Sequence, residues 1–219
     1  MYTRRRALAI GAVGIGALSG CAEVASGDGP IERSAAPAEV ESSTLDETGH
    51  ELEEQREETI SREVEAAGQS RDVEATNYAT VYTKTIDGTE AEGSVFGLVT
   101  TPAFKIAGQS FSPVADADNE KILEFVGSQF GQLSVTETVE ETERTILEED
   151  ATVTTFDAEA EFNGEQIPVY IHVTSVEHED DIVIAAGAYP QELEDAEADN
   201  ITTLLDGIDH PVDDASEWE

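Results

Sequence analysis

Cysteine is nearly absent from this 219-residue chain, which contains Cys21 and no second cysteine. Because a disulfide needs two cysteines, none can form within the chain, and an extracellular domain built from it must rely on its core. Tryptophan is equally scarce, with one residue near the C-terminus. Sugar-binding sites usually present several aromatic side chains, so this shortage counts against glycoside chemistry, although the many carboxylates leave a two-carboxylate mechanism open.

The motifs of the common catalytic classes are also missing. The sequence has no Gly-x-Ser-x-Gly nucleophile elbow. It has no glycine-rich phosphate loop, no dinucleotide fingerprint and no His-Glu-x-x-His zinc motif. We therefore expect no cofactor, no metal and no catalytic residue, and a non-catalytic protein is favoured over an enzyme.

Basic residues are scarce, since 11 Lys and Arg face 49 Asp and Glu, which gives a formal net charge of −38. No basic patch exists to neutralise phosphates, so nucleic acid is not an expected partner. The acidic residues are spread along the chain rather than gathered in one tail. Such a charge opposes compact folding in dilute buffer, whereas at 1 M salt the Debye length falls to about 3 Å. The composition therefore predicts a halophile's protein that needs molar salt to fold.

Long apolar runs are missing too. Residues 7–18 form the longest apolar stretch near the N-terminus, but three glycines interrupt it. It is shorter than the roughly 20 residues that span a bilayer. Arg4, Arg5 and Arg6 precede it, and paired arginines before a weakly apolar stretch are typical of a twin-arginine export signal. The ordinary secretory route is the alternative.

The export signal runs into the sequence Leu18-Ser19-Gly20-Cys21. Small residues before a cysteine are typical of a lipobox, in which the thiol takes a lipid after cleavage. A diacylglycerol-type lipid supplies the two chains that stable anchoring requires. We therefore expect a protein anchored to the extracellular side of the cell membrane through Cys21. The alternative is an incidental cysteine beside an ordinary cleavage site.

Composition divides the chain into four parts. We expect a signal peptide over residues 1–20, a lipidated Cys21 with a flexible tether over 21–36, one domain over 37–210 and an acidic tail over 211–219. The tether assignment rests on its small residues, Gly and Pro. The central part is long enough to bury a core of its own.

Alternation of apolar and polar residues predicts strands over residues 72–83, 94–101, 152–162, 167–173 and 182–189. Asn163-Gly164 favours a tight hairpin turn between the third and the fourth of these strands. The continuous apolar run of the fifth predicts a central position in a sheet. Residues 50–66 are interpreted as a strand, with a helix over their glutamate-rich half as the alternative. Ala-Gly-Gln-Ser occurs at 67–70 and at 107–110, and both copies are interpreted as hairpin turns.

Three helices are expected. One covers Ser42–Thr48 and ends at Gly49, one follows Asp118 as its N-cap, and the last covers residues 196–209. The predicted fold class is α+β, an antiparallel sheet of long strands with helices packed on it. The order of a helix, long antiparallel strands and a C-terminal helix is similar to the Mog1/PsbP-type sandwich, a likeness of shape alone.

Several segments resemble an uncharacterised family of haloarchaeal lipoproteins, a domain of unknown function. The resemblance rests on residues 47–50, 67–71, 104–111, 169–174 and 188–193. It implies a secreted, acidic and lipid-anchored protein, and it implies no activity, substrate or catalytic residue.

Histidines and acidic clusters are the remaining candidates for chemistry. His178 lies in Glu177-His178-Glu179-Asp180-Asp181, which we interpret as a solvated turn in preference to a cation site. A second cluster, Asp116, Asp118 and Asn119, also suggests a cation site, but helix capping by Asp118 explains it better. His172 lies in a strand and is assigned a structural role, whereas His50 and His210 lie near element ends and receive none.

The sequence therefore predicts a lipid-anchored extracellular cell-surface protein of a halophilic archaeon. Its expected function is to bind an unknown protein or small-molecule ligand without catalysis. The alternative is a cell-envelope hydrolase that uses carboxylates.

Overall fold

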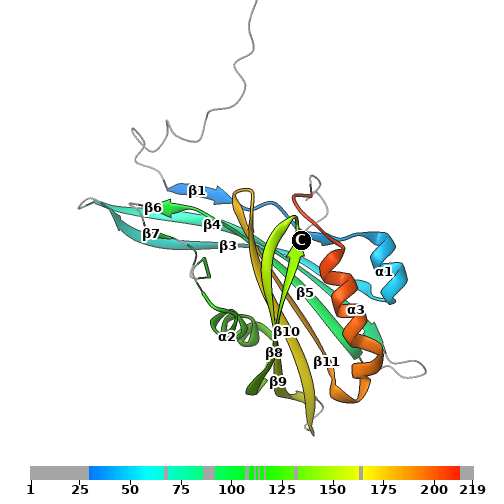
Figure 1. The fold of residues 1–219 in the computed structure, drawn as a ribbon. Coiled ribbons are helices and arrows are strands. Elements are labelled where there is room, and N and C mark those ends of the chain that lie inside the picture. The colour runs from blue at the N-terminus through cyan, green and yellow to red at the C-terminus, as the bar shows by residue number, and fades with distance from the viewer. Residues whose placement is uncertain are drawn as a thin grey trace, which may run out of the picture.

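The computed structural model describes residues 30–66, 69–85, 92–106, 109–110, 112, 114–115, 117–130, 133–162 and 165–212. Eight strands form one curved sheet (Figure 1). They are β1 (Ile31–Ser34), β3 (Glu51–Ala66), β4 (Gln69–Thr85), β5 (Glu92–Pro102), β8 (Leu133–Ile146), β9 (Glu149–Phe162), β10 (Glu165–His178) and β11 (Asp181–Pro190). Two short pairs are β2 (Glu39–Val40) with β12 (Ile208–Asp209), and β6 (Lys105–Ile106) with β7 (Gln109–Ser110). The helices are α1 (Ser42–Thr48), α2 (Asn119–Phe130) and α3 (Glu194–Asp206), the last preceded by the 3₁₀ turn η2 (Gln191–Leu193).

The sheet is mixed rather than antiparallel throughout. Its strands follow the order β3, β4, β5, β11, β10, β9 and β8, and each of these neighbours is antiparallel. β1 is the exception, because it runs parallel to β4, from Ile31 opposite Val73 to Ser34 opposite Thr76. The expectation of an antiparallel sheet is therefore wrong at this one strand.

β1 also corrects the expected tether, since residues 31–34 lie within the range 21–36 that composition assigned to a flexible segment. β5 pairs with β4 only from Tyr78 onward. The adjacent edge of β4, around Val73 and Ala75, is therefore available to β1. Unpaired backbone groups at a sheet edge are stabilised by taking a further strand. The tether becomes ordered where this partner is available.

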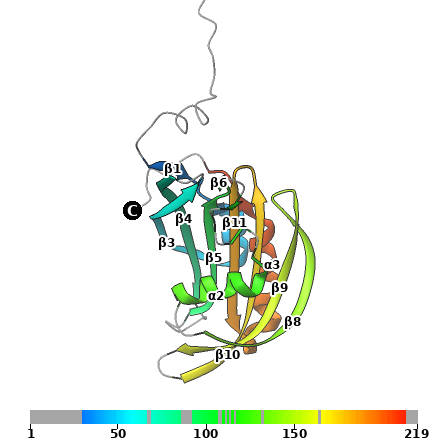
Figure 2. The ribbon, with the colours of Figure 1, turned by 90° about the vertical axis from the view of Figure 1, so that its left-hand side faces the viewer.

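Helices cover the sheet on both faces (Figure 2). On one face, Phe96, Leu98 and Val183 of the sheet pack with Ile201 and Leu204 of α3. On the other face a second cluster forms around α2. Its members include Phe156, Val173, Ile182 and Ile184 of the sheet with Ile122 and Leu123 of α2. β11 contributes to both clusters because it is buried on both faces, as its continuous apolar sequence predicts.

All of the predicted strands form. β4, β5, β9, β10 and β11 contain the segments expected to be strands, and the strand interpretation of residues 50–66 is confirmed by β3. Asn163-Gly164 lies outside the described residues, but Phe162 and Glu165 on either side of it are paired. Each Ala-Gly-Gln-Ser copy begins outside them too, and its Gln and Ser start the second strand of a pair, β4 or β7. The turn after β10 is shorter than expected, because Asp181 already belongs to β11.

The helices require one correction. α1 has its expected bounds, and Gly49 ends it in the left-handed conformation, with a φ of 74°. α3 ends at Asp206 instead of residue 209, since Ile208 and Asp209 pair with β2. Gly207 makes this possible, because a Cβ atom there would clash with the side chain of Thr44 of α1. Among the described residues, no helix is long and apolar enough to cross a membrane.

Candidate functional site

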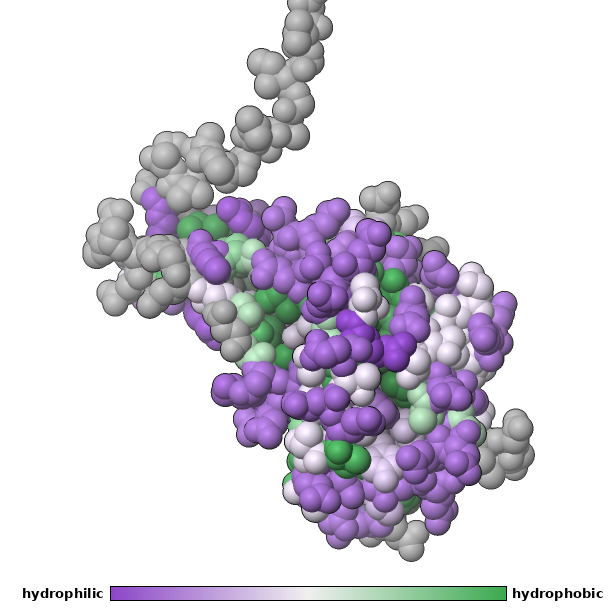
Figure 3. Space-filling view, in the orientation of Figure 1, coloured by the Kyte–Doolittle hydropathy of each residue, from purple (hydrophilic) through white to green (hydrophobic). Residues whose placement is uncertain are grey.

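The candidate site is a groove of about 170 Å³ on the α2 face of the sheet. α2 packs against the β10 side of that face, while the part formed by β3 and β4 stays uncovered by it (Figure 2). Apolar surface is visible in the hollow between the β3–β4 ribbon and α2 (Figure 3). Apolar side chains form most of the groove, including Ile60, Ala75, Ala79, Val99, Val114 and Ile184.

Strand register explains why these residues meet. Arg56 of β3 lies opposite Ala79 of β4, which lies opposite Val99 of β5, which lies opposite Ile184 of β11. Side chains opposite one another in neighbouring strands point to the same face. Two residues further along β3, Glu58 lies opposite Asn77, and the next such pair is Ile60 with Ala75. Small side chains on β4 therefore form a low floor between larger neighbours.

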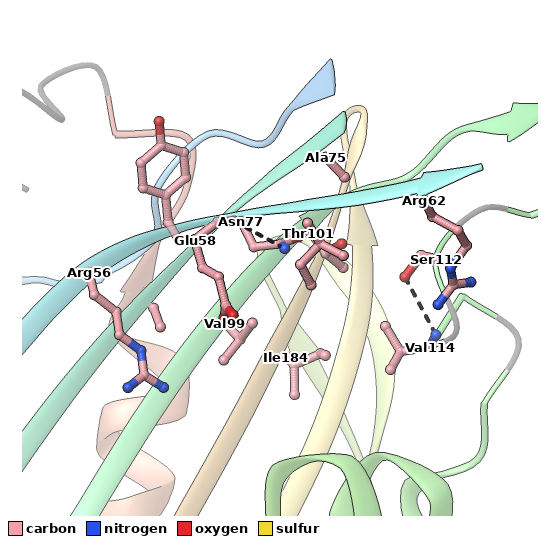
Figure 4. A pocket seen from close by; sticks show the side chains of 13 residues that line it. Arg56, Glu58, Arg62, Ala75, Asn77, Val99, Thr101, Ser112, Val114 and Ile184 are labelled. Atoms are coloured by element: carbon pink, nitrogen blue, oxygen red, sulfur yellow. Dashed lines mark hydrogen bonds between the residues drawn. The ribbon is translucent and has the colours of Figure 1, made fainter. Parts of the chain in front are cut away.

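The charged residues of the groove all come from β3. Arg56, Glu58 and Arg62 lie on its groove face, since they alternate along the strand. Figure 4 places the two arginines at opposite ends of the groove, with Arg62 beside Ser112. Arg56 also has a loose contact of 3.6 Å with Glu54. In a chain with 11 basic residues, two arginines in one groove form an unusual concentration of positive charge.

The rim near Arg62 is closed by a short segment before α2. The backbone N–H of Val114 donates a hydrogen bond of 3.4 Å to the Ser112 hydroxyl, and both residues are buried. Val114 packs into the apolar cluster around α2. This end of the groove thus places a hydroxyl and a guanidinium beside an apolar wall.

A second polar cluster lies at the end of the β10–β11 hairpin. His178 Nδ1 and His210 Nδ1 are 2.9 Å apart, so one nitrogen carries a hydrogen and the other accepts it. His210 Nε2 lies 3.3 Å from a carboxylate oxygen of Asp181, without hydrogen-bond alignment. The backbone N–H of Ala36 donates to the same oxygen at 2.7 Å.

This cluster corrects the interpretation of residues 177–181 as a solvated turn. Asp181 and His210 are buried, with exposed fractions of 6% and 5%. Only Glu179 and Asp180 form the turn itself. This cluster could not be predicted from the sequence, because His210 and Ala36 come from opposite ends of the domain. Among the described residues, no group of three or more His, Cys, Asp and Glu side chains could hold a metal ion.

Two further histidines are buried away from the groove. His50 Nε2 lies 3.1 Å from the Ser94 hydroxyl, and burial lowers the pKa of His50 to about 4, against an opposing effect of Glu197. Ser94 and His50 are each 2% exposed, so a substrate cannot reach this pair. Glu197 forms a salt bridge of 2.6 Å with Lys84 nearby. The buried pair is a structural polar cluster that sequence spacing could not reveal.

His172 matches the structural role assigned from the sequence. Its Nδ1 lies 3.0 Å from the Thr155 hydroxyl and its Nε2 lies 3.1 Å from the Tyr189 hydroxyl. Burial lowers the pKa of His172 to about 4, so its ring is neutral at neutral pH. Asp118 is the predicted cap, because its carboxylate accepts a hydrogen bond of 3.0 Å from the backbone N–H of Lys121. That bond lowers the pKa of Asp118.

The residues predicted to direct export and anchoring are not part of this geometry. Arg4, Arg5, Arg6, Leu18, Ser19, Gly20 and Cys21 lie outside the described residues, as does Asp116. No functional role was predicted for the groove residues from the sequence. Alternation along β3 and β4 could have placed them on one face, but no sequence signal shows where α2 stops covering that face.

Comparison with known proteins gives one family and a group of distantly similar solved structures. A family model described as a domain of unknown function, DUF6517, matches residues 37–209. No curated protein matches the chain. The solution structure of cyanobacterial PsbP (CyanoP) from Synechocystis sp. PCC 6803 has 9% identity and a TM-score of 0.37, and the match covers 85% of this chain and 98% of that one.

Two further solved structures are similar at the same level. LpqN of Mycobacterium tuberculosis, described as involved in cell envelope biogenesis, has 9% identity and a TM-score of 0.29, over 73% of this chain and 88% of its own. PA94 of Pseudomonas aeruginosa, a protein of unknown function, has 8% identity and a TM-score of 0.32, over 67% and 94%. Identities and scores this low assign no function to the chain.

Proposed function

Since the chain belongs to the DUF6517 family, a domain of unknown function, we propose from its own groove that it is a non-catalytic binding module with a small-molecule ligand. The observation that carries the proposal is the groove itself. It is concave, most of its surface is apolar, and it lies on a well-packed sheet. Ligand sites in proteins are typically concave, mostly apolar and equipped with a few placed polar groups.

We further propose that this module acts on the extracellular side of the cell membrane in a halophilic archaeon. The export arginines, the lipobox and the acidic composition support this location. Nine residues lie between Cys21 and Ile31, where β1 begins. β1 pairs with β4 beside Ala75, which lines the groove. The tether would therefore join the domain next to the binding site.

The alternative, a hydrolase that uses two carboxylates, receives no support from the groove. Glu58 is the one carboxylate among the described residues that line it. Glycoside hydrolysis usually requires a second carboxyl group across the scissile bond. For the fold, we propose a PsbP-like sandwich, because α1, the long strands and α3 follow one another in that order along the chain.

Filling the groove tests the binding proposal. Ala79→Phe places a large ring on the groove floor, while Ala196→Phe places the same ring on an exposed turn of α3. Hexanol, a neutral single-chain probe, should saturably shift the NMR signals of the Val99, Val114 and Ile184 methyl groups. We expect Ala79→Phe to abolish these shifts and Ala196→Phe to preserve them. Wild-type protein without saturable shifts would refute the proposal.

The anchor is tested separately. Cys21→Ser removes the thiol that would take the lipid. We expect the variant to be released into the medium or to remain unprocessed, as followed by immunoblotting of membrane and medium fractions. A variant that stays in the membrane fraction at the mature size would show that Cys21 is not the anchor.

A further inference from the structure

We infer that the ligand is a short amphipathic carboxylate, with its head at the Arg62–Ser112 end of the groove and its chain on the apolar floor. This inference rests on the proposed binding function. Three features of the groove carry it: its volume, the distribution of its polar groups and the position of Arg62.

The volume limits the apolar part of the ligand. The groove measures about 170 Å³, whereas an engineered apolar cavity of about 150 Å³ holds one benzene molecule. A short alkyl chain or a single ring fits this space, and the two long chains of a membrane lipid do not. A six-carbon chain is therefore a suitable probe.

The charged groups are confined to particular places in the groove. Between its ends the floor is formed largely by Ala75, Ala79, Val99 and Ile184, which offer dispersion contacts, and Asn77 and Thr101 add neutral polar groups. Glu58 lies between the arginines on β3 and disfavours an anionic group at the centre. An anionic head is favoured at an end of the groove, where a guanidinium is present.

Arg62 is the better placed of the two arginines. Figure 4 shows its guanidinium beside Ser112 and Val114, while that of Arg56 lies at the other end of the groove, far from both. Arg62 already makes an interaction of its own, but a guanidinium has five N–H donors and can serve several acceptors. Its planar fork matches the two oxygens of a carboxylate. The Ser112 hydroxyl adds a polar group on the same side.

The acidic surface does not prevent anion binding under the proposed conditions. The net charge of −38 repels anions over long distances in dilute buffer. At 1 M salt the Debye length is about 3 Å, so that repulsion is screened while direct contact with Arg62 persists. Charge selectivity is then set by the groups that touch the ligand.

The test compares three six-carbon probes in molar NaCl with the mature protein: hexanoate, hexanol and hexylammonium. Affinities come from NMR titration of the Val99, Val114 and Ile184 methyl groups. We expect hexanoate to bind about fivefold tighter than hexanol, as an exposed ion pair allows, and hexylammonium to bind weakest. Arg62→Gln should lower hexanoate affinity to that of hexanol and leave hexanol affinity unchanged.

Two control variants locate the effect. Lys121→Gln removes an exposed positive charge outside the groove and should change neither affinity. Arg56→Gln should change hexanoate binding much less than Arg62→Gln does. Equal affinities for hexanoate and hexanol in the wild type would overturn the inference while the binding function stands. Selectivity that is lost in Arg56→Gln and kept in Arg62→Gln would overturn the assigned head position, and no binding of any probe would overturn both proposals.

Discussion

β11 and β3 belong to the same sheet but differ in almost every physical respect. In β11, five consecutive residues from Asp181 to Ala185 are buried, because α3 covers one face and α2 the other. In β3, the residues from Glu57 to Glu63 are exposed on both faces. The neighbouring strands β5, β11 and β10 thus form the centre of the core. β3 pairs with β4 and is exposed to solvent. The groove lies where the covered part of the sheet meets the uncovered part.

The difference also shows how the acidic residues are used. β3 and β8 lie at the two ends of the strand order, and both are rich in Glu. Charged side chains on an end strand oppose pairing with other chains. Exposed apolar side chains such as Ile60 and Val139 occur singly among them. The core strands instead provide the apolar side chains that stabilise the fold.

The largest expected effect is on the core side of the comparison. Phe96 of β5 is fully buried, so Phe96→Ala should destabilise the domain by about 3–5 kcal/mol. Ile60 of β3 is 41% exposed, so Ile60→Ala should cost roughly 0.5 kcal/mol. Chemical denaturation in molar salt measures both free energies of unfolding. Similar losses in the two variants would break the distinction between the two parts of the sheet.

We expect the stability of the domain to depend on pH through the buried His172. Burial lowers the pKa of His172 from 6.5 to about 4, so the unfolded chain takes up a proton between these values that the folded protein does not. The stability contributed by the neutral ring is fully present above about pH 6.5 and is lost as the pH falls toward 4. Between these limits, the wild type should lose up to about 3 kcal/mol more stability than His172→Gln. Parallel pH profiles would show that His172 is not the source.

Gly187 tests how closely α3 packs on the sheet. A Cβ atom at this position of β11 would lie 2.7 Å from Ile201 Cδ1. Gly187→Ala should therefore cost about 1–3 kcal/mol through overpacking. Adding Ile201→Val, which removes that methyl group, should recover part of the loss in thermal unfolding. If the double variant is less stable than the sum of the single losses implies, the close contact is not the cause.

The smallest expected effect concerns a contact between an end strand and a helix. Arg144 of β8 donates two hydrogen bonds of 2.9 Å to the carboxylate of Asp206 in α3. The pair is partly exposed, so a double-mutant cycle with Arg144→Gln and Asp206→Asn should give a coupling energy of about 0.5 kcal/mol. A coupling energy well above about 1 kcal/mol would show that the end strands contribute more to stability than their exposure suggests.

The covered part of the molecule was predictable from sequence, and the uncovered part was less so. Residues 182–189 form a buried strand because an apolar run without charges has no stable alternative to burial. α1 has its predicted bounds because Gly49 offers the left-handed conformation that ends a helix. No element was predicted over Leu133–Ile146, because residues 134–143 are exposed and show no alternation of apolar and polar side chains.

The candidate site was not predictable for a related reason. The groove depends on the register of the strands and on how far α2 extends over the sheet. Local sequence encodes neither of these. The cluster of Asp181, His178 and His210 depends on contacts between the two ends of the domain. In contrast, the capping role of Asp118 and the structural role of His172 follow from local position and match the structure.

A crystal structure of the mature protein, purified from its native host in molar salt, would show whether the groove binds a short-chain ligand. We predict an open groove between Arg62 and Ile184 that holds density for such a ligand, with its polar end beside Ser112. A groove filled by the protein's own side chains, with no ligand density and no room for a six-carbon chain, would contradict it.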